Sequence, residues 1–512
     1  MGSKIKSLLV ANRSEIAIRV FRAAAELGIR TIAIYAEQDR LSLHRFKADQ
    51  AFLVGKGKGP LEAYLSIEDV LRVAKEAGAD AIHPGYGFLS ESPEFAEACG
   101  QAGIIFIGPT PKTMRTLGNK VDARNLAVST GVPVMPASLP LSDDADAIRK
   151  AAAAVGYPVM LKASWGGGGR GMRVIERESE LIDSVMIGRR EAKAAFGKDE
   201  VYLEKLIRNA RHVEVQILGD QHGQLVHLFE RDCSIQRRNQ KLVERAPAPY
   251  LSEASRQDLC ESALKIGRAT DYVGAGTVEF LMDTDTGAFY FIEVNPRIQV
   301  EHTVTEVVTG LDIVKAQIRI LEGGRIGARG PDGHWETGIP AQDAIRLNGH
   351  AIQCRITTEN PENNFIPDFG RISAYRGAMG FGIRIDGGTA FSGAVVTRYY
   401  DPLLEKLTAW ATTTDEVIDR MNRALVEYRI RGVATNLAFL HNVVAHPRFR
   451  ANDYTTRFID ETPALFDFPE RKDRATKLLT WIADVTVNGH PETKDRARPP
   501  AVARSVQAPR FE

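Results

Sequence analysis

The first 118 residues repeat one pattern, in which a short apolar run is followed by an amphipathic stretch. "SLLVA" precedes "SEIAIRVFRAAAELG", and "TIAIYA", "ADAIHPG" and "IIFIGP" continue the apolar series. Strands that alternate with helices pair in parallel, with helices on both faces of the sheet. The sequence therefore predicts an α/β domain over residues 1–118. Its first strand-to-helix turn, "ANRSEIA", lacks GxGxxG, so no dinucleotide site is predicted.

Charge and cysteine content narrow the class of protein. The 512-residue chain has a formal net charge of +1, so no global field favours nucleic acid or an anionic membrane. The four cysteines form no CxxC pair, which argues against zinc sites and disulfides and favours a reducing compartment. No apolar run approaches the ~18 residues of a membrane helix. Because a strand-like run begins almost at Met1, no signal peptide is expected, and the predicted location is cytoplasmic.

The pattern of strand-like and helix-like runs changes twice more along the chain. At roughly 150 residues per domain, about three domains are expected. Residues 119–320 are richer in hairpin-like strands, and residues 340–455 form a third region of strands that ends in "TDEVIDRMNRALVEYRIRG". We expect residues 456–512 to be a linker whose Pro- and Ala-rich end has no core of its own.

A glycine-rich segment, "KASWGGGGRGMRV", stands within the second region. It is not a P-loop, because Met172 follows Gly171 where a P-loop has lysine, and the next run is strand-like. The pattern predicts a strand–loop–strand flap whose bare backbone amides wrap a polyphosphate, with Lys162 adding a positive charge. The alternative is an ordinary surface turn.

Two acids stand on one predicted hairpin, "GTVEFLMDTDTGAFYFIEVNPRIQVEH". Folding it about residue 286 places Glu279 opposite Glu293, an unfavourable pair that a divalent cation would relieve. Alternation along the second strand places Phe289 and Phe291 on the same face as Glu293, together with Asn295 and Arg297. Without a metal, the two acids would share a proton or face water.

Polar residues continue beyond the hairpin. Arg297 is suited to binding a planar oxyanion such as bicarbonate, and Glu301 to accepting a proton. Each has an alternative as a surface ion pair.

A second basic cluster is "ERDCSIQRRNQKLVE". Read as one extended strand, it places Lys241 and Asn239 on one side and Gln236 on the other, and the face with Lys241 and Asn239 is suited to lining an anion pocket. The alternative is a solvated edge strand. His212 opens another predicted strand, and a lone histidine there favours a structural role.

These motifs together resemble the biotin carboxylase component of biotin-dependent carboxylases, which are ATP-grasp enzymes. The resemblance rests on "ANRSEIAIRV", "HPGYGFLSE", "GNK", "KASWGGGGRGM", "RHVEVQ", "ERDCSIQRRNQK", "EVNPRIQVEH", "HAIQCRI" and "YYDPLL". Within this family the chain looks most like the N-terminal part of pyruvate carboxylases. The pointers are Ser14 where acyl-CoA carboxylases usually have glycine, Asn239 where they usually have histidine, and the tail "DRATKLLTWIADVTVNGHP".

The resemblance implies a Rossmann-like N-terminal domain, an ATP-grasp domain with a mobile lid at about residues 138–205, and a mixed α/β C-terminal domain. It also assigns roles to individual residues. The implied ATP-binding residues are Lys120, Lys162, Gly166, Gly167, Gly168, Gly169, Glu204, Lys205, Leu206, His212 and Gln236. The implied metal ligands for Mg²⁺ or Mn²⁺ are Glu279, Glu293 and Asn295. The implied catalytic residues are Lys241, Arg297, Glu301 and Arg355, with Gln299 and Val300 in the bicarbonate pocket and Tyr86 and Gly87 beside biotin.

The implied reaction is ATP-dependent carboxylation of biotin at N1′ through carboxyphosphate. The chain has no "MKM" motif and no carboxyltransferase barrel, so the resemblance implies separate carrier and carboxyltransferase domains as partners. It further implies a homodimer, a tetramer at full length, and an acetyl-CoA activator site. The residues implied for that site are Arg429, Arg431, Arg471, Asp473 and Arg474.

Two rival functions remain open. One is the biotin carboxylase subunit of an acyl-CoA carboxylase, against which Asn239 and the tail argue. The other is an effector-binding module without activity, against which the retained Lys241, Glu279 and Glu301 argue.

Overall fold

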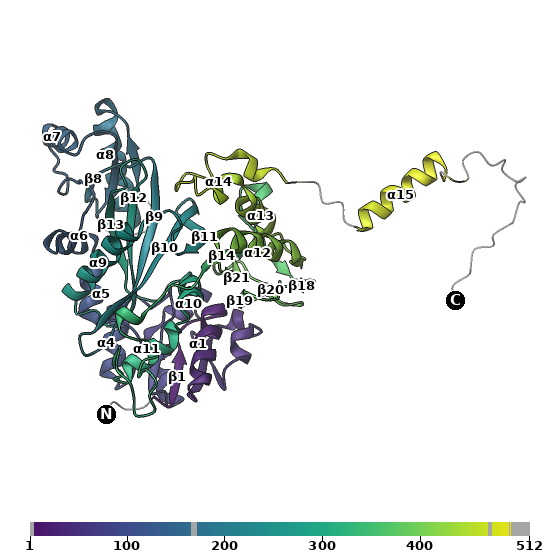
Figure 1. Ribbon diagram of the computed structural model, residues 1–512, viewed down its shortest axis with the longest axis horizontal. Coiled ribbons are helices and arrows are strands. Elements are labelled where there is room, and N and C mark those ends of the chain that lie inside the picture. The colour runs from purple at the N-terminus through teal and green to yellow at the C-terminus, as the bar shows by residue number, and fades with distance from the viewer. Residues whose placement is uncertain (1–4, 165–171, 469–473, 491, 493–512) are drawn as a thin grey trace, which may run out of the picture. The chain divides into compact units, whose positions relative to one another are not determined.

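The parallel sheet predicted at the N-terminus is present and has five strands, in the order β3–β2–β1–β4–β5. It lies in the purple part of the chain, where Figure 1 labels β1 and α1. The computed structural model describes residues 5–164, 172–468, 474–490 and 492. The strands are β1 (Ser7–Val10), β2 (Arg30–Tyr35), β3 (Gln50–Leu53), β4 (Ala81–His83) and β5 (Ile105–Phe106). The helices that follow them are α1 (Ser14–Glu26), α2 (Pro60–Leu65), α3 (Ile67–Glu76), α4 (Pro93–Gln101) and α5 (Pro111–Gly118).

Helices cover both faces of this sheet, as its apolar strands require. Successive strand side chains point to opposite faces. Accordingly, Leu8 and Val10 pack in a buried cluster with residues of α1 and of α11 (Ile313–Leu321), whereas Leu9 packs in another with residues of α3 and α4. The helix α11 comes from the second predicted region, so residues far apart in sequence share the N-terminal core.

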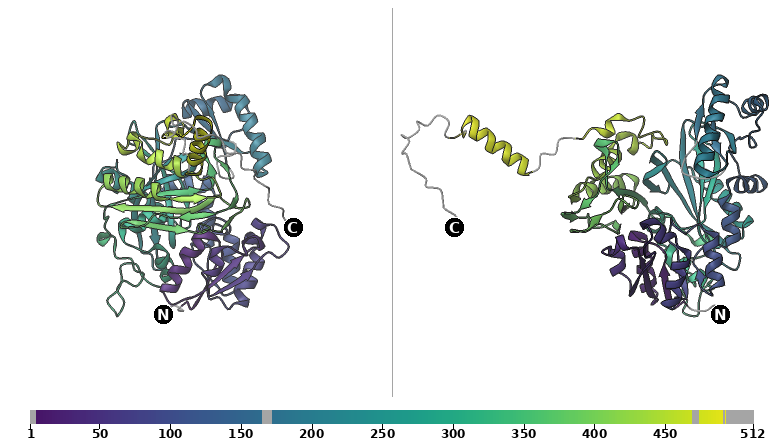
Figure 2. Two further views of the ribbon diagram at one scale, coloured as in Figure 1. Left: turned by 90° about the vertical axis from the view of Figure 1, so that its right-hand side faces the viewer. Right: turned by 180° about the vertical axis from the view of Figure 1, so that it is seen from behind.

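A single eight-stranded sheet runs through the second and third predicted regions, in the order β13–β12–β9–β10–β11–β14–β21–β19. Its teal and green strands, seen together in Figure 2, join where β11 pairs antiparallel with β14. The strands are β9 (Ala210–Gly219), β10 (Leu225–Arg237), β11 (Gln240–Ala246), β12 (Gly274–Asp283), β13 (Phe289–Asn295), β14 (His350–Thr357), β19 (Ile383–Gly387) and β21 (Leu403–Ala411). Besides α11 and the helices of the predicted lid, the helices of these regions are α6 (Lys120–Ser129), α9 (Glu253–Ala269), α10 (His302–Thr309), α12 (Thr414–Glu427), α13 (Leu437–Ala445) and α14 (Pro447–Arg450).

A small three-stranded sheet with its own core occupies the predicted lid. Its strands β6 and β7 pair antiparallel on either side of the glycine-rich segment, as the strand–loop–strand pattern requires. The predicted phosphate-binding glycines, Gly166 to Gly169, lie outside the described residues. The elements here are β6 (Val159–Ala163), β7 (Arg173–Ile175), β8 (Val201–Lys205), α7 (Ala145–Val155) and α8 (Leu181–Phe196).

Short two-stranded sheets complete the third region. They pair β15 (Glu359–Asn360) with β16 (Ile366–Pro367), β17 (Gly370–Arg371) with β20 (Val395–Val396), and β18 (Ala374–Arg376) with β22 (Arg429–Arg431).

Residues 467–512 form a separate unit that contains α15 (Arg474–Asn488). Within the parts of the chain that the structure describes, no helix has the length and apolarity that crossing a bilayer demands.

The start of α1 meets the loop after β19 so closely that a glycine is required there. A Cβ on Gly388 would lie 2.0 Å from Ser14 Oγ and 2.5 Å from the Glu15 amide nitrogen. We expect Gly388→Ala to lower the free energy of unfolding in urea by about 1–3 kcal/mol through overpacking. The matched control is Gly100→Ala in α4, where a Cβ meets no atom within 4 Å and a helical alanine gains roughly 0.8 kcal/mol. Equal stability of the two variants would contradict the close contact.

Candidate active site

Polar side chains occupy one face of the large sheet. On β9, His212, Glu214 and Gln216 alternate with Val213 and Val215, which pack in the apolar core behind the sheet. The neighbouring strand β12 continues the pattern, because Thr277 and Glu279 alternate with the core residues Val278 and Phe280. Since strand side chains alternate, the sheet separates an apolar face from a polar one. This polar face is the floor of the candidate site.

The predicted register of the acidic hairpin is confirmed, because Glu279 and Glu293 are direct cross-strand partners. The predicted shared face is wrong for the phenylalanines. A bulge follows this pair, so that Phe280 opposes Phe291, and Phe289 and Phe291 pack in or against the core. One extra residue on a bulged strand reverses the alternation, which simple period-2 counting does not anticipate.

Each of the two acids has its own basic partner. Glu279 Oε1 lies 2.9 Å from Lys241 Nζ, and its Oε2 lies 2.9 Å from His212 Nε2. Glu293 Oε2 lies 3.5 Å from Lys120 Nζ. Burial acts to raise the pKa of Glu279, but Lys241 and His212 hold that pKa well below its ordinary value. The buried acid is therefore a carboxylate, which disfavours the proton-sharing alternative.

Two side-chain amides lie against Glu279. Asn295 Nδ2 and Gln299 Nε2 donate to Glu279 Oε1 over 2.9 and 3.0 Å, so the amide groups of both residues adjoin the acid pair. Among the described residues, the groups whose ligand-type atoms lie within 4.8 Å of one another are His212–Glu214–Glu279 and Glu214–Cys233–Glu301. Neither group contains Glu293, so the metal set of Glu279, Glu293 and Asn295 stays a prediction that rests on carboxylate and amide oxygens being suitable ligands for a hard divalent cation.

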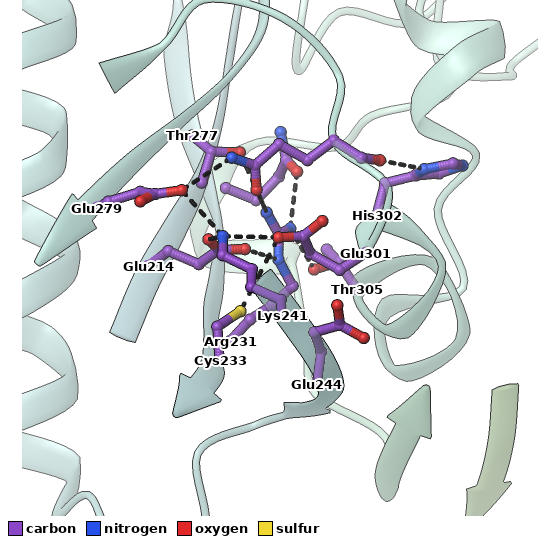
Figure 3. Close-up of polar contacts among 12 residues, drawn as sticks. Glu214, Arg231, Cys233, Lys241, Glu244, Thr277, Glu279, Glu301, His302 and Thr305 are labelled. Atoms are coloured by element: carbon purple, nitrogen blue, oxygen red, sulfur yellow. Dashed lines mark hydrogen bonds and ion pairs between the residues drawn. The ribbon is translucent and has the colours of Figure 1, made fainter. Parts of the chain in front are cut away.

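Lys241 lies at the centre of the site (Figure 3). Its Nζ is 2.5 Å from Glu214 Oε2, 2.9 Å from Glu279 Oε1 and 2.7 Å from Glu301 Oε1. Burial opposes the charged form, yet the three carboxylates raise the pKa of Lys241 well above its ordinary value. The ammonium is therefore a permanent positive charge that joins strands β9 and β12 to the loop before α10.

The basic cluster around Lys241 is a tight hairpin, and its prediction as one extended strand was wrong. Strand β10 ends at Arg237, and Arg238 and Asn239 turn the chain with φ of 49° and 64°. Two consecutive left-handed residues make the two-residue turn typical of hairpins. Gln236 consequently pairs across the strands with Lys241 instead of lying on the opposite side.

Glu301 lies in the loop between β13 and α10, between two basic side chains. Its Oε1 contacts Lys241, and its Oε2 is 3.0 Å from Arg355 Nη2. Burial acts to raise the pKa of Glu301, whereas Lys241, Arg355 and Arg231 hold it below its ordinary value. The residue is thus ionised near neutral pH, the form in which a carboxylate accepts a proton.

The two predicted catalytic arginines differ in their surroundings. Arg355, on β14, also lies 2.5 Å from Glu244 Oε1 through its Nε. Burial raises the pKa of Glu244, and Arg355 opposes that rise. Arg297 is one-fifth exposed, and its Nε lies 2.5 Å from Glu91 Oε1 of the N-terminal region. Arg297 therefore forms an ion pair with the N-terminal region. Arg355 joins β14 of the third region to Glu244 and Glu301 of the second region.

The sequence analysis missed the fully buried Arg231. Its Nε lies 2.6 Å from Glu214 Oε1, and its two terminal nitrogens donate to Gln216 Oε1 at 2.8 Å and Thr277 Oγ1 at 3.1 Å. These contacts satisfy a charge that is otherwise unfavourable in the interior. Alternating polar residues within an apolar strand, as in "RHVEVQ", were the available signal for its partners Glu214 and Gln216. Glu91, Glu214 and Glu244 were missed as well.

The other predicted nucleotide residues lie mainly on the small sheet. Lys162 and Glu204 form an ion pair between β6 and β8. Lys205 Nζ donates to the carbonyl oxygens of Gly156 and Tyr157 at 2.8 and 2.9 Å. The Leu206 amide donates to the Pro158 carbonyl oxygen at 3.2 Å.

The predicted biotin and effector residues lie on separate parts of the chain. The carbonyl oxygen of Tyr86 accepts from Asn12 Nδ2 at 2.8 Å, and Gly87 follows with φ of 67°. Arg429 and Arg431 are exposed on β22, which belongs to a two-stranded sheet apart from the large one. Arg471, Asp473 and the side chain of Arg474 lie outside the described residues.

Three family models match this chain. Residues 4–114 match the biotin carboxylase N-terminal domain, residues 119–328 the ATP-binding domain of the carbamoyl-phosphate synthase L chain, and residues 353–461 the biotin carboxylase C-terminal domain.

Similar proteins cover almost the whole chain. Pyruvate carboxylase of Bacillus subtilis is 52% identical over 97% of this chain, which spans 42% of that protein. A Rhizobium etli pyruvate carboxylase solved with acetyl coenzyme A has a TM-score of 0.87 and is 68% identical in sequence. The match covers 100% of this chain and 45% of the Rhizobium etli chain. The biotin carboxylase domain of Hydrogenobacter thermophilus 2-oxoglutarate carboxylase, in complex with MgADP, ADP and bicarbonate, has a TM-score of 0.85 and 45% identity. That match covers 91% of this chain and 100% of the domain.

Removing the central ammonium tests the electrostatics of the site. We expect Lys241→Met to lower the free energy of unfolding near neutral pH by about 3–5 kcal/mol, because it leaves buried carboxylates uncompensated. In the wild type, the depressed pKa values of Glu279 and Glu301 keep their contribution complete above their ordinary pKa of 4.5. In the variant, burial is opposed less strongly and both pKa values shift upward, so the stability of the variant falls relative to the wild type as pH rises.

Denaturant unfolding between pH 5 and 8 measures this difference. The control is Lys315→Met, which removes a partly exposed ion pair with Glu26 and is expected to change stability by no more than about 1 kcal/mol. A Lys241→Met protein whose stability relative to the wild type is independent of pH would contradict the assigned role of the ammonium.

Proposed function

Because the chain belongs to the biotin carboxylase family, we propose that it carboxylates biotin at N1′ with ATP and bicarbonate, as the first half-reaction of a pyruvate carboxylase. The observation that carries the proposal is the ionised Glu301 held between Lys241 and Arg355. That arrangement combines a proton acceptor with fixed positive charge, which suits deprotonation of a small oxyanion. The names of the relatives favour the pyruvate enzyme over an acyl-CoA carboxylase.

Bicarbonate would bind between Lys241 and Arg297, with Gln299 and Val300 completing the pocket. Glu301 accepts the bicarbonate proton, and the anion then attacks the γ-phosphate of ATP, which forms carboxyphosphate as the bond to the β-phosphate breaks and ADP leaves. Lys241 and Arg297 offset the negative charge that develops on the reacting oxygens. No covalent enzyme intermediate is required, so positioning and charge account for the chemistry.

ATP would lie between the small sheet and the large one. Lys120, Lys162, Glu204, Lys205, Leu206, His212, Gln236 and the outlying glycines would surround it. Glu279, Glu293 and Asn295 would hold Mg²⁺ or Mn²⁺ with the nucleotide, where the metal neutralises phosphate charge. His212 is proposed to contact nucleotide as well as Glu279.

Biotin would bind where Arg355 meets the segment of Tyr86 and Gly87. Breakdown of carboxyphosphate gives CO₂ and phosphate, and the phosphate takes the N1′ proton. Arg297 and Arg355 then stabilise the enolate-like ureido anion, which attacks CO₂. A site closed to water would protect the unstable intermediate.

Partners follow from the longer relatives, because this chain spans about two-fifths of their length. We propose that a biotin carrier domain and a carboxyltransferase domain complete the overall reaction in the cytoplasm. We further propose a homodimer, or a tetramer for the full-length protein. Arg429, Arg431, Arg471, Asp473 and Arg474 are proposed to contribute to an acetyl-CoA site, a ligand present in one related structure.

The direct test is release of ADP from MgATP, with and without bicarbonate and free biotin. We expect bicarbonate-dependent release that free biotin stimulates. Because positioned charge carries the chemistry, Glu301→Gln and Arg297→Ala are each expected to lower kcat by about 10²-fold or more. The control is Glu261→Gln on the exposed face of α9, which should retain wild-type turnover. Near-wild-type rates for Glu301→Gln would refute its role as the base.

A further inference from the structure

A lysine outside the assigned site is completely buried next to it. Lys406, on β21, has no exposed surface, and its Nζ donates to the Val300 carbonyl oxygen at 2.9 Å. The same ammonium lies 3.1 Å from Glu15 Oε2 on α1. One side chain of the third region thus contacts the proposed bicarbonate loop and the N-terminal helix.

The surroundings of Lys406 make its charge unfavourable unless anions compensate it. In the sheet, Lys406 pairs with Arg355 on one side and with Asp386 on the other. Like charges on adjacent strands repel. Asp386 and Glu15 supply opposite charge, and neither Glu15 oxygen accepts a well-formed hydrogen bond from the described residues. Lys406 is therefore the main compensation for the buried Glu15 carboxylate.

The contact with Val300 fixes a whole peptide group. The Val300–Glu301 peptide is trans and planar, so its carbonyl oxygen and the Glu301 amide N–H point in opposite directions. Holding the carbonyl toward Lys406 therefore directs that N–H away from it. This peptide joins two residues of the proposed pocket, and Gln299 precedes it.

We propose that Lys406 is a positioning residue for the bicarbonate pocket. It acts through its hydrogen bond to the Val300 carbonyl oxygen, and its ion pair with Glu15 holds it in place. The inference rests on the proposed function. The Lys406 ammonium contacts the Val300 carbonyl oxygen and Glu15 and lies 6.0 Å from the centre of the Tyr86 ring, so it holds the loop from which Gln299, Val300 and Glu301 act. Loss of this hydrogen bond should weaken bicarbonate use more than ATP use, because misplacement by about 1 Å is sufficient to impair a reaction.

Three variants separate positioning from simple stability. Lys406→Met removes the contact with Val300 and leaves Glu15 uncompensated. We therefore expect a lower midpoint of thermal unfolding and a higher KM for bicarbonate. Lys406→Met combined with Glu15→Gln removes both charges and should restore the midpoint. Glu15→Gln alone keeps the lysine contact with Val300 and is the control. The readouts are thermal unfolding, KM for bicarbonate, KM for ATP and kcat.

We expect the double variant to unfold at the wild-type temperature, yet to need at least about tenfold more bicarbonate, with an ATP requirement near that of the wild type. A double variant with wild-type KM for bicarbonate would overturn the inference, as would an equal rise in Glu15→Gln. If the wild type itself showed no bicarbonate-dependent ADP release, the proposed function would fail, and this inference with it. Failure of the inference alone requires an active wild type.

Discussion

The ammonium of Lys241, surrounded by the carboxylates of Glu214, Glu279 and Glu301, joins parts of the chain that are distant in sequence. Buried ions on this scale are tolerated only when each has close partners of opposite charge. Arg231 and Arg355 extend the network behind and beside the lysine. The register of β9, the hairpin of β12 and β13, and the loop before α10 all have to be correct for these partners to meet. The strand register that brings these charges together is therefore the same register that forms the site.

The position of the site follows from the large sheet. The pairing of β11 with β14 places Glu244 beside Gln353, so that Arg355, two residues further along, reaches both Glu244 and Glu301. The N-terminal region contributes from another side, through Glu91 at Arg297. Charged groups of all three regions therefore meet at the site, and ion pairs between them add to the apolar packing.

Sequence reasoning predicted what depends on local pattern. The alternating runs gave the parallel sheet, and the position of the turn gave the pairing of Glu279 with Glu293. It could not predict the bulge that buries Phe289 and Phe291, because one extra residue leaves no signature in the apolar pattern. It also missed the left-handed turn at Arg238 and Asn239, since arginine is an unusual residue there. Partners of Lys241 such as Glu214 depend on pairing between strands, which spacing along one strand does not reveal.

The junction of β11 and β14 has a consequence for the nascent chain. Ala246 and Ala351 are directly paired, so the middle of the sheet stays open until the ribosome has released the segment near residue 351. Until then, β11 presents unpaired backbone groups along the edge that β14 later covers, a template for pairing with another molecule. Long-range strand pairing also slows folding. Chaperone demand during synthesis should therefore peak in this interval and fall once β14 closes the sheet.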